Sequence, residues 1–249
     1  MAGRPDNALP RVIAHRGASA EAPENTLAAF DLAAEQGADM VELDVQASRD
    51  GQLVVIHDAT VDRTTNGSGA VRDYSWAELR QLDAGGWFAS RYTAERIPTL
   101  GDVCRFASGR IALNLEVKCQ PGEFAPLAGS FLSELAAHDH LSSALISAFS
   151  LPVLVELRRL SPVVQLAYLF AGAWPGGEQY ERLALAALHP KHSLVDAPRV
   201  SEAHARGLAV NVWTVDERAR WGELVALAVD GVVTNKPAGL LAYLLSGSR

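Results

Sequence analysis

Short apolar runs alternate with amphipathic helical stretches along most of this chain of 249 residues, and this alternation restricts the fold more than any other feature. Brief runs rich in Val, Ile and Leu are typical of buried strands, and strands separated by helices form parallel sheets. The expected strands are Arg11–His15, Met40–Ser48, Ile111–Val117, Ala144–Phe149, Val164–Phe170, Ala184–Leu188, Leu208–Val215 and Gly231–Thr234. Eight such strands predict an α/β fold that closes into a TIM (β/α)8 barrel.

Helical stretches follow or separate these strands, with turn and capping residues at several of their ends. The expected helices are Thr26–Gln36, Trp76–Leu82, Leu100–Ala107, Phe124–Ala137, Pro152–Leu160, Pro198–Arg206, Glu217–Ala228 and Ala238–Leu245. Residues from about 59 to 98 break the rhythm, and such a long irregular stretch is usually a functional insertion. We call it the insertion. Because no linker divides the chain, we expect one domain over residues 1–249.

A turn signal after Ser48 joins the second strand to another β-rich run, Gln52–His57, which predicts a hairpin. Strand alternation places Glu42 and Asp44 on one face, where two acids need partners. If Ser48 pairs with the first residue of the second run, His57 falls level with both acids. This register brings residues that are well separated in sequence into one site.

In a barrel of this kind, chemistry occurs at the carboxyl ends of the strands. The polar residues at or near those ends are His15, Arg16, Glu42, Asp44, His57, Asn114, Glu116 and Lys118. Three carboxylates favour a hard cation, Mg²⁺ or Ca²⁺ with Mn²⁺ as a further candidate, over zinc. Arg16 and Lys118 suit an anionic oxygen, and two histidines suit general acid and base. Together they indicate metal-assisted phosphoryl chemistry.

Each residue taken alone also has a structural explanation, because partly buried histidines and strand-face ion pairs occur in ordinary cores. Their shared position at strand ends, predicted independently of them, favours a site. His189, Lys191 and His192 follow another expected strand, and a loop face is the default expectation for them, with substrate contact the minority alternative. Trp213 points to the barrel mouth if its strand keeps the predicted register, and otherwise belongs to the core.

The composition excludes some classes of function. A net charge of −7 argues against a nucleic-acid partner, although a bound metal leaves a phosphate substrate open. Cys104 and Cys119 cannot build a disulfide framework, which favours a reducing compartment. The stretch Met1–Pro10 is polar, and no apolar run is long enough to span a bilayer, so we expect a cytoplasmic protein without membrane insertion. Monomer and dimer remain equally compatible.

A set of short motifs runs in one order from residue 11 to about 237. The motifs are His15-Arg16-Gly17, Pro23-Glu24-Asn25-Thr26, Glu42-Leu43-Asp44-Val45, Asp50-Gly51, His57-Asp58, Thr64-Thr65-Asn66-Gly67, Asp83-Ala84-Gly85-Gly86-Trp87-Phe88, Glu116-Val117-Lys118, Ser147-Ala148-Phe149 and Val212-Trp213-Thr214-Val215. Each is weak alone, but as a set they are specific. The chain resembles the glycerophosphodiester phosphodiesterase family, and within it the compact cytosolic bacterial branch.

The resemblance implies a TIM barrel with a small inserted cap and a role for each matching residue. It implies a divalent metal held by Glu42, Asp44 and Glu116, with His15 and His57 as the general acid and base. It implies that Arg16 and Lys118 contact the phosphate and that Asn25 supports the phosphate site. Trp213 would pack against the glycerol of the substrate. Two departures are mild. Asp216 stands where the family often has Asn after Thr-Val, and Ala148 varies a Ser-Ser-Phe pattern.

These observations predict a phosphoric diester hydrolase that converts small glycerophosphodiesters to sn-glycerol 3-phosphate and an alcohol. The alcohol, the physiological metal, the order in which the histidines act and the existence of a cyclic phosphate intermediate stay open. A lysophospholipase D activity is the alternative, although the chain lacks a basic amphipathic helix for docking to membranes. A non-catalytic phosphodiester-binding barrel would predict a broken set of site residues. A glycosidase would not need two histidines with Arg16 and Lys118.

Overall fold

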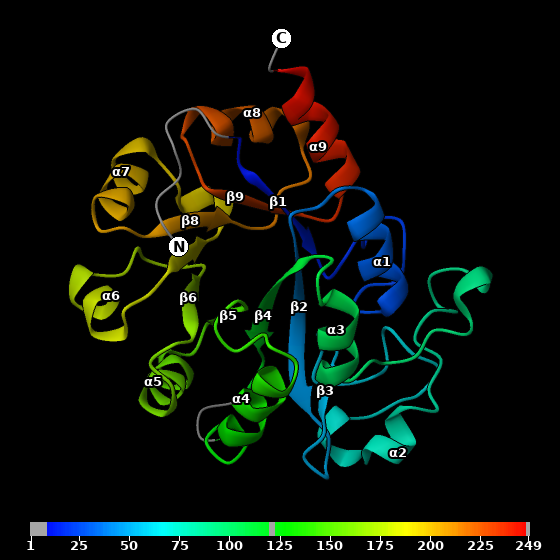
Figure 1. Ribbon diagram of the computed structural model, residues 1–249. Coiled ribbons are helices and arrows are strands. Elements are labelled where there is room, and N and C mark those ends of the chain that lie inside the picture. Colours follow the sequence, from blue (N-terminus) through cyan, green and yellow to red (C-terminus); the bar gives the residue numbers. More distant parts are fainter. Residues whose placement is uncertain (1–8, 120–122, 248–249) are drawn as a thin grey trace.

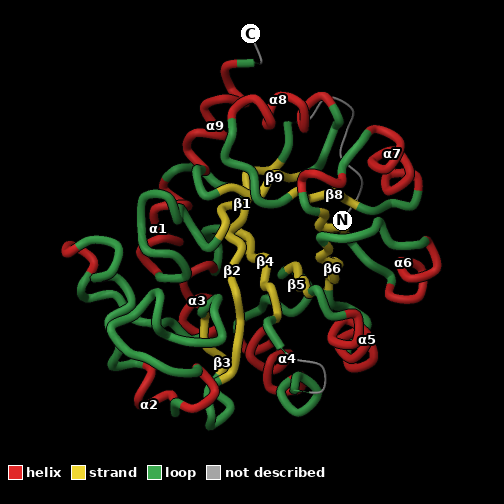
Figure 2. The backbone as a smooth tube through the Cα atoms, turned by 180° about the vertical axis from the view of Figure 1, so that it is seen from behind, coloured by secondary structure: helices red, strands yellow, loops and turns green. Residues whose placement is uncertain are grey.

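Strand β1 (Arg11–His15) pairs in parallel with both β2 (Met40–Ala47) and β9 (Gly231–Thr234), and this double pairing closes the sheet. The structure is a computed structural model that describes residues 9–119 and 123–247. The ring is completed by β4 (Ala112–Val117), β5 (Leu145–Ala148), β6 (Gln165–Phe170), β7 (Ala187–Pro190) and β8 (Ala209–Val212). Figures 1 and 2 show helices around the outside of the strands. The predicted TIM barrel is confirmed.

The helices other than α6 lie close to the ranges that the sequence predicted. They are α1 (Leu27–Glu35), α2 (Trp76–Leu79), α3 (Leu100–Ala107), α4 (Ala128–Ala137), α5 (Leu151–Leu160), α6 (Gly177–Leu183), α7 (Ala197–Ala205), α8 (Arg218–Ala226) and α9 (Pro237–Ser246). Short 3₁₀ turns are η1 (Val71–Asp73), η2 (Ser90–Tyr92) and η3 (His192–Leu194). Within the described ranges, none of the helices combines the length and apolar character needed to cross a bilayer.

The hairpin after β2 has the register that the sequence predicted. β3 (Leu53–Val55) runs antiparallel to β2, with Val45 opposite Val55, and the Ser48 N–H donates to the Gln52 carbonyl at 3.0 Å. The strand is shorter than expected and ends before His57. Beyond it, the Gln46 amide donates to three successive carbonyl groups of residues 56–58, which fixes the chain as it leaves the sheet.

The insertion packs beside β3 on a small core of its own. Val54 and Ile56 contribute to this core, together with Val61, Val71, Leu79, Ala84 and Ile97 from the insertion itself. A capping box at Ser75 and Glu78 starts its short helix, α2. The insertion therefore follows β3 in the chain and packs beside this outer strand (Figure 1).

The structure corrects two expectations in one region. The sequence placed a strand at Ala184–Leu188, but α6, which was not predicted, precedes it and Ala184 has a φ of 44°. A residue in this left-handed conformation cannot continue a strand, so β7 starts at Ala187. The shift places His189 inside β7 with 1% of its surface exposed, rather than on a loop face. Part of the expected polar start of the chain, residues 1–8, lies outside the described residues.

Candidate active site

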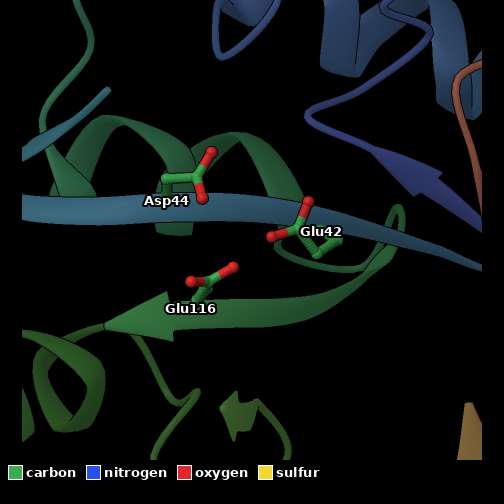
Figure 3. A group of neighbouring side chains, drawn as sticks. All are labelled: Glu42, Asp44 and Glu116. Atoms are coloured by element: carbon green, nitrogen blue, oxygen red, sulfur yellow. The ribbon is translucent and has the colours of Figure 1, made fainter. Parts of the chain in front are cut away.

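Three carboxylates meet inside the barrel at the ends of two neighbouring strands. Glu42 and Asp44 alternate along β2, and the register of β2 with β4 sets Asp44 beside Glu116. The three side chains point toward one another (Figure 3), and ligand oxygens from each lie within 4.8 Å of one another. All three residues are buried. The alternation read from the sequence therefore brings the predicted acids together.

Burial and mutual repulsion make full ionisation of this cluster unfavourable. Burial, with Asp44 and Glu116 nearby, holds the pKa of Glu42 well above its usual value. Burial and Asp44 raise the pKa of Glu116 to about 7. Burial also opposes ionisation of Asp44, but Lys118 and Arg16 outweigh it and lower the pKa of that carboxyl. Three buried carboxylates that repel one another fit a hard divalent cation, because its positive charge would offset their repulsion.

Two cationic side chains border the carboxylates, as the sequence predicted. Lys118 Nζ lies 2.5 Å from Glu116 Oε1 and 3.2 Å from Asp44 Oδ1. Arg16 Nε lies 3.2 Å from Asp44 Oδ2, but the contact lacks hydrogen-bond geometry, so this buried N–H has no hydrogen-bond partner among the described residues. A buried donor without a partner is a natural contact for an anionic oxygen.

The loop after β1 holds Arg16 in an uncommon backbone conformation. Arg16 has a φ of 57° and Asn25 a φ of 58°, both in the left-handed region that most side chains avoid. The Arg16 N–H donates to the Glu42 carbonyl at 2.8 Å, and the Asn25 N–H donates to the Arg16 carbonyl at 3.0 Å. The side-chain amide of Asn25 also donates to Asp44 Oδ2 at 2.8 Å. Asn25 thus fixes the position of both the Arg16 backbone and the Asp44 carboxylate.

The two predicted histidines line one pocket of about 190 Å³, together with Glu42, Glu116 and Lys118. His15 Nδ1 lies 2.7 Å from Asn235 Oδ1, and His57 Nδ1 lies 2.7 Å from Asp58 Oδ1. The other ring nitrogen of His15, Nε2, lies 4.0 Å from Glu42 Oε2. Burial and the nearby Arg16 lower the pKa of His15 to about 4, so it is neutral at pH 7.

Aromatic side chains form another wall of this pocket. Trp213 lines it, in agreement with the predicted register, and its Nε1–H donates to the His189 carbonyl at 2.7 Å. Phe149 meets Trp213 edge to face with 5.5 Å between ring centroids. A second, larger groove of about 800 Å³ shares His57, Lys118 and Phe149 with the pocket. The groove therefore adjoins the pocket at these side chains.

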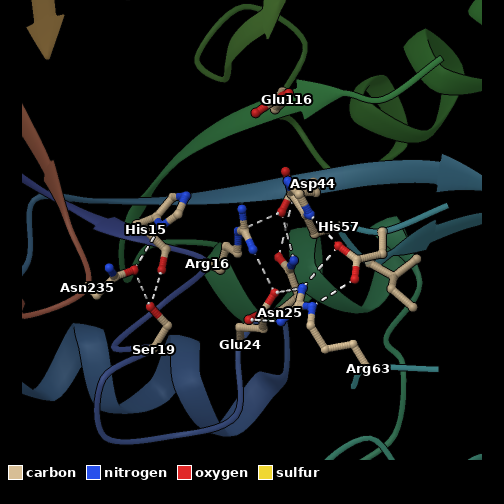
Figure 4. Close-up of polar contacts among 12 residues, drawn as sticks. His15, Arg16, Ser19, Glu24, Asn25, Asp44, His57, Arg63, Glu116 and Asn235 are labelled. Atoms are coloured by element: carbon tan, nitrogen blue, oxygen red, sulfur yellow. Dashed lines mark hydrogen bonds and ion pairs between the residues drawn. The ribbon is translucent and has the colours of Figure 1, made fainter. Parts of the chain in front are cut away.

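Several residues that hold this arrangement had no role in the sequence prediction. Asn235 contacts His15 (Figure 4). Asp58 contacts His57 and accepts a hydrogen bond from Arg63 of the insertion at 2.7 Å. Asp58 was visible as part of a motif, and its place next to a candidate histidine is a signal for a supporting role. Arg63 and Asn235 gave no such signal, because their positions depend on the insertion and on barrel closure.

Comparisons with known proteins agree on one family. Residues 15–239 match the model of the glycerophosphoryl diester phosphodiesterase family. A glycerophosphodiester phosphodiesterase of Caldanaerobacter subterraneus subsp. tengcongensis is 35% identical over 95% of this chain and 98% of its own. One from Bacillus subtilis is 31% identical over 94% of this chain and 85% of its own. The structure of an Oleispira antarctica phosphodiesterase in complex with the product sn-glycerol-3-phosphate has a TM-score of 0.89 and 36% identity, covering 95% of this chain and 97% of that one.

Proposed function

The chain belongs to the glycerophosphoryl diester phosphodiesterase family, and from this membership we propose that it hydrolyses glycerophosphodiesters with a divalent cation and two histidines. Its class is that of a phosphoric diester hydrolase. The observation that carries the proposal is the common pocket of His15 and His57, which also contains Glu42 and Glu116 of the acidic cluster. The products are sn-glycerol 3-phosphate and an alcohol.

The protein's own residues have complementary roles in this reaction. Arg16 and Lys118 border the cluster and bind the phosphoryl oxygens, offsetting negative charge as it grows in the transition state. One histidine takes a proton from the attacking oxygen, and the other gives a proton to the leaving alkoxide as its bond to phosphorus breaks. The attacking oxygen belongs either to water or to the neighbouring glycerol hydroxyl. The second case gives a cyclic phosphate that water then opens.

Glu42, Asp44 and Glu116 would hold the cation, because three buried carboxylates offer hard oxygen ligands with no thiolate among them. Bound there, Mg²⁺, Ca²⁺ or Mn²⁺ would supply Lewis-acid polarisation of the phosphoryl group. The pocket of about 190 Å³ suits the glycerol phosphate half of a substrate, with Trp213 and Phe149 against its carbon chain. The alcohol half would extend into the larger groove.

A lysophospholipase D activity is the second candidate, and the larger groove is the observation in its favour. Val117, Pro126, Leu127 and Phe149 line that groove, which gives an acyl-bearing alcohol an apolar surface. A lysophospholipid and a glycerophosphodiester would present the same phosphodiester to His15 and His57. The two activities therefore differ in what fills the groove, and a direct comparison of substrates separates them.

The test is release of sn-glycerol 3-phosphate from glycerophosphocholine by protein stripped with EDTA, after Mg²⁺, Ca²⁺ or Mn²⁺ is added back singly. We expect a metal to restore turnover, and Glu42→Ala to abolish it, while Glu35→Ala on the exposed face of α1 keeps it. His15→Ala and His57→Ala should each lose at least about 10²-fold in kcat, the usual contribution of a general acid or base.

The remaining outcomes are equally informative. Near wild-type turnover in either histidine variant would contradict the role proposed for that residue. A folded, metal-binding protein that leaves glycerophosphocholine intact but cleaves lysophosphatidylcholine would favour the second candidate. Failure to bind any of the three metals, measured by calorimetry, would contradict the proposed use of the acidic cluster.

A further inference from the structure

Asp216, just beyond β8, accepts three hydrogen bonds from the end of β9 and the loop that follows it. Its Oδ1 accepts from the Thr234 hydroxyl and from the Asn235 backbone N–H, each at 2.8 Å, and its Oδ2 accepts from Asn235 Nδ2 at 2.6 Å. β8, β9 and β1 are consecutive neighbours in the barrel. Asp216 therefore lies one side chain away from His15, which ends β1.

Asp216 determines which end of the Asn235 amide faces His15. A carboxylate only accepts hydrogen bonds, so the amide group 2.6 Å from Asp216 Oδ2 must be the NH₂. The opposite orientation would set two oxygens against each other at that distance. Asn235 Oδ1 consequently faces His15 Nδ1 at 2.7 Å (Figure 4). The Ser19 hydroxyl shares its proton between this oxygen, at 2.8 Å, and the His15 carbonyl, at 2.7 Å.

We propose that Asp216 sets the tautomer of His15 through Asn235 and thereby makes His15 the proton acceptor of the histidine pair. An amide oxygen cannot donate, so His15 Nδ1 must carry a proton, and in the neutral ring Nε2 therefore keeps its lone pair. Nε2 is also the nitrogen on the side of the acidic cluster, 4.0 Å from Glu42 Oε2. Asp216 is thus a positioning residue, and the inference rests on the catalytic role proposed above for His15.

The proton transfer follows from this tautomer. As the attacking oxygen forms its bond to phosphorus, its O–H bond breaks and the proton moves to the free Nε2 of His15. His15 Nδ1 keeps its own proton and its hydrogen bond to Asn235 throughout, so the ring ends the step as a cation. Protonation of the leaving alkoxide then belongs to His57, on the other side of the same pocket.

An amide in place of the Asp216 carboxylate is expected to reverse the orientation of the Asn235 side-chain amide and, with it, the tautomer of His15. The Asn235 backbone N–H and the Thr234 hydroxyl would hold the oxygen of the substituted side chain, which turns its new NH₂ toward the Asn235 side chain. Asn235 would then present its own oxygen to position 216 and its NH₂ to His15. His15 Nδ1 would have to accept, and its proton would move to Nε2.

The experiment is ¹⁵N NMR of histidine-labelled protein with Mg²⁺ present, with His15 assigned through the loss of its signals in His15→Gln. Wild type should show the proton on His15 Nδ1. Asp216→Asn should move it to Nε2 and lower kcat by about 10²-fold, with KM changed much less. In the exchange variant Asp216→Asn/Asn235→Asp, a carboxylate again accepts from His15 Nδ1, so both the tautomer and most of kcat should return.

Asp31→Asn, which removes the same charge from the exposed face of α1, is the matched control and should change neither readout. A proton on Nε2 of His15 in wild type would overturn the proposal, even if Asp216→Asn fails to fold. An unchanged tautomer in folded Asp216→Asn would overturn it as well. A reversed tautomer with unchanged kcat would uphold the control by Asp216 and contradict the catalytic role of His15 instead.

Discussion

Arg63 of the insertion and Glu24 of the loop after β1 form a two-pronged ion pair, with Nη1 2.7 Å from Oε2 and Nη2 2.9 Å from Oε1. The same guanidinium binds Asp58, which holds His57, and Glu24 also accepts from Arg16 Nη1 at 2.8 Å. One side chain of the insertion thus connects the loop that carries Arg16 with Asp58, the partner of His57. Figure 4 shows Arg63 next to Glu24.

Replacing Arg63 with Ala should lower kcat while changing the free energy of unfolding only slightly. Its side chain is 44% exposed, so the lost ion pairs contribute little to the free energy of unfolding. Asp58 would lose its anchor, however, and His57 would lose its fixed orientation. We expect Arg63→Ala to lower kcat roughly 10-fold, the usual effect of losing a group that orients an active-site ligand. Steady-state kinetics on glycerophosphocholine measure this.

Arg96→Ala is the matched control for Arg63, because Arg96 also lies in the insertion and its guanidinium donates to backbone carbonyls of residues 93 and 95. It should keep wild-type kcat. Arg63→Lys retains the charge but not the planar fork that contacts Glu24 and Asp58 together, so only partial activity is expected. Equal activity of Arg63→Ala and Arg96→Ala would show that the connection has no catalytic role.

The acidic cluster predicts a pH-dependent stability in the presence of chelator. Burial and Asp44 raise the pKa of Glu116 to about 7 from the usual 4.5, so between these values the folded protein keeps a proton that the unfolded chain has lost. The contribution of Glu116 to the free energy of unfolding is then fully present below pH 4.5 and is lost as pH rises through 7. The loss from Glu116 is of the order of 3 kcal/mol. The low pKa values of His15 and His189, about 4 and about 3, make stability rise with pH up to about 6.5 and oppose this effect below that pH. We therefore expect Tm in EDTA to decrease between about pH 6.5 and pH 8.

Two further measurements test whether Glu116 causes this pH dependence of Tm. Saturating Mg²⁺ or Ca²⁺ should raise Tm most at the alkaline end of that range, because a cation then replaces the proton as the partner of the carboxylates. Glu116→Gln should flatten the decrease in EDTA and weaken the gain from metal. A Tm that rises with pH over the same range in EDTA would contradict the raised pKa of Glu116.

The parts of the site that depend on local periodicity were predictable from sequence. Glu42 and Asp44 share a face because side chains alternate along a strand, and the hairpin turn after Ser48 fixes the register of His57 beside them. Glu116 lies on β4, the next parallel strand, and Lys118 follows directly after the end of that strand, where its N–H still donates to the Val45 carbonyl of β2. The spacing of two residues therefore directs both side chains to the same face. These relations need only the strand assignment and the length of one turn.

The parts that depend on closure of the barrel were not predictable in this way. Asn235 reaches His15 because β9 is the neighbour of β1, a pairing between the two ends of the chain. Asp216 reaches the site through Asn235. His189 was placed wrongly because the left-handed turn at Ala184 delays the start of β7, and no residue there signals that conformation.

Gly17 is expected to be essential for the shape of the loop that carries Arg16. It has a φ of 87°, and a Cβ there would lie 2.6 Å from the Ala29 carbonyl carbon of α1, so Gly17→Ala forces loop and helix apart. Gly51 has a φ of 82° with open space around a Cβ, so Gly51→Ala isolates the backbone strain. We expect Gly51→Ala to lower the free energy of unfolding by about 1 kcal/mol. Gly17→Ala should lower it by roughly 3 kcal/mol and also reduce kcat/KM, because Arg16 shifts. Denaturation with urea measures both variants, and equal midpoints would show that the loop adapts to the added methyl group.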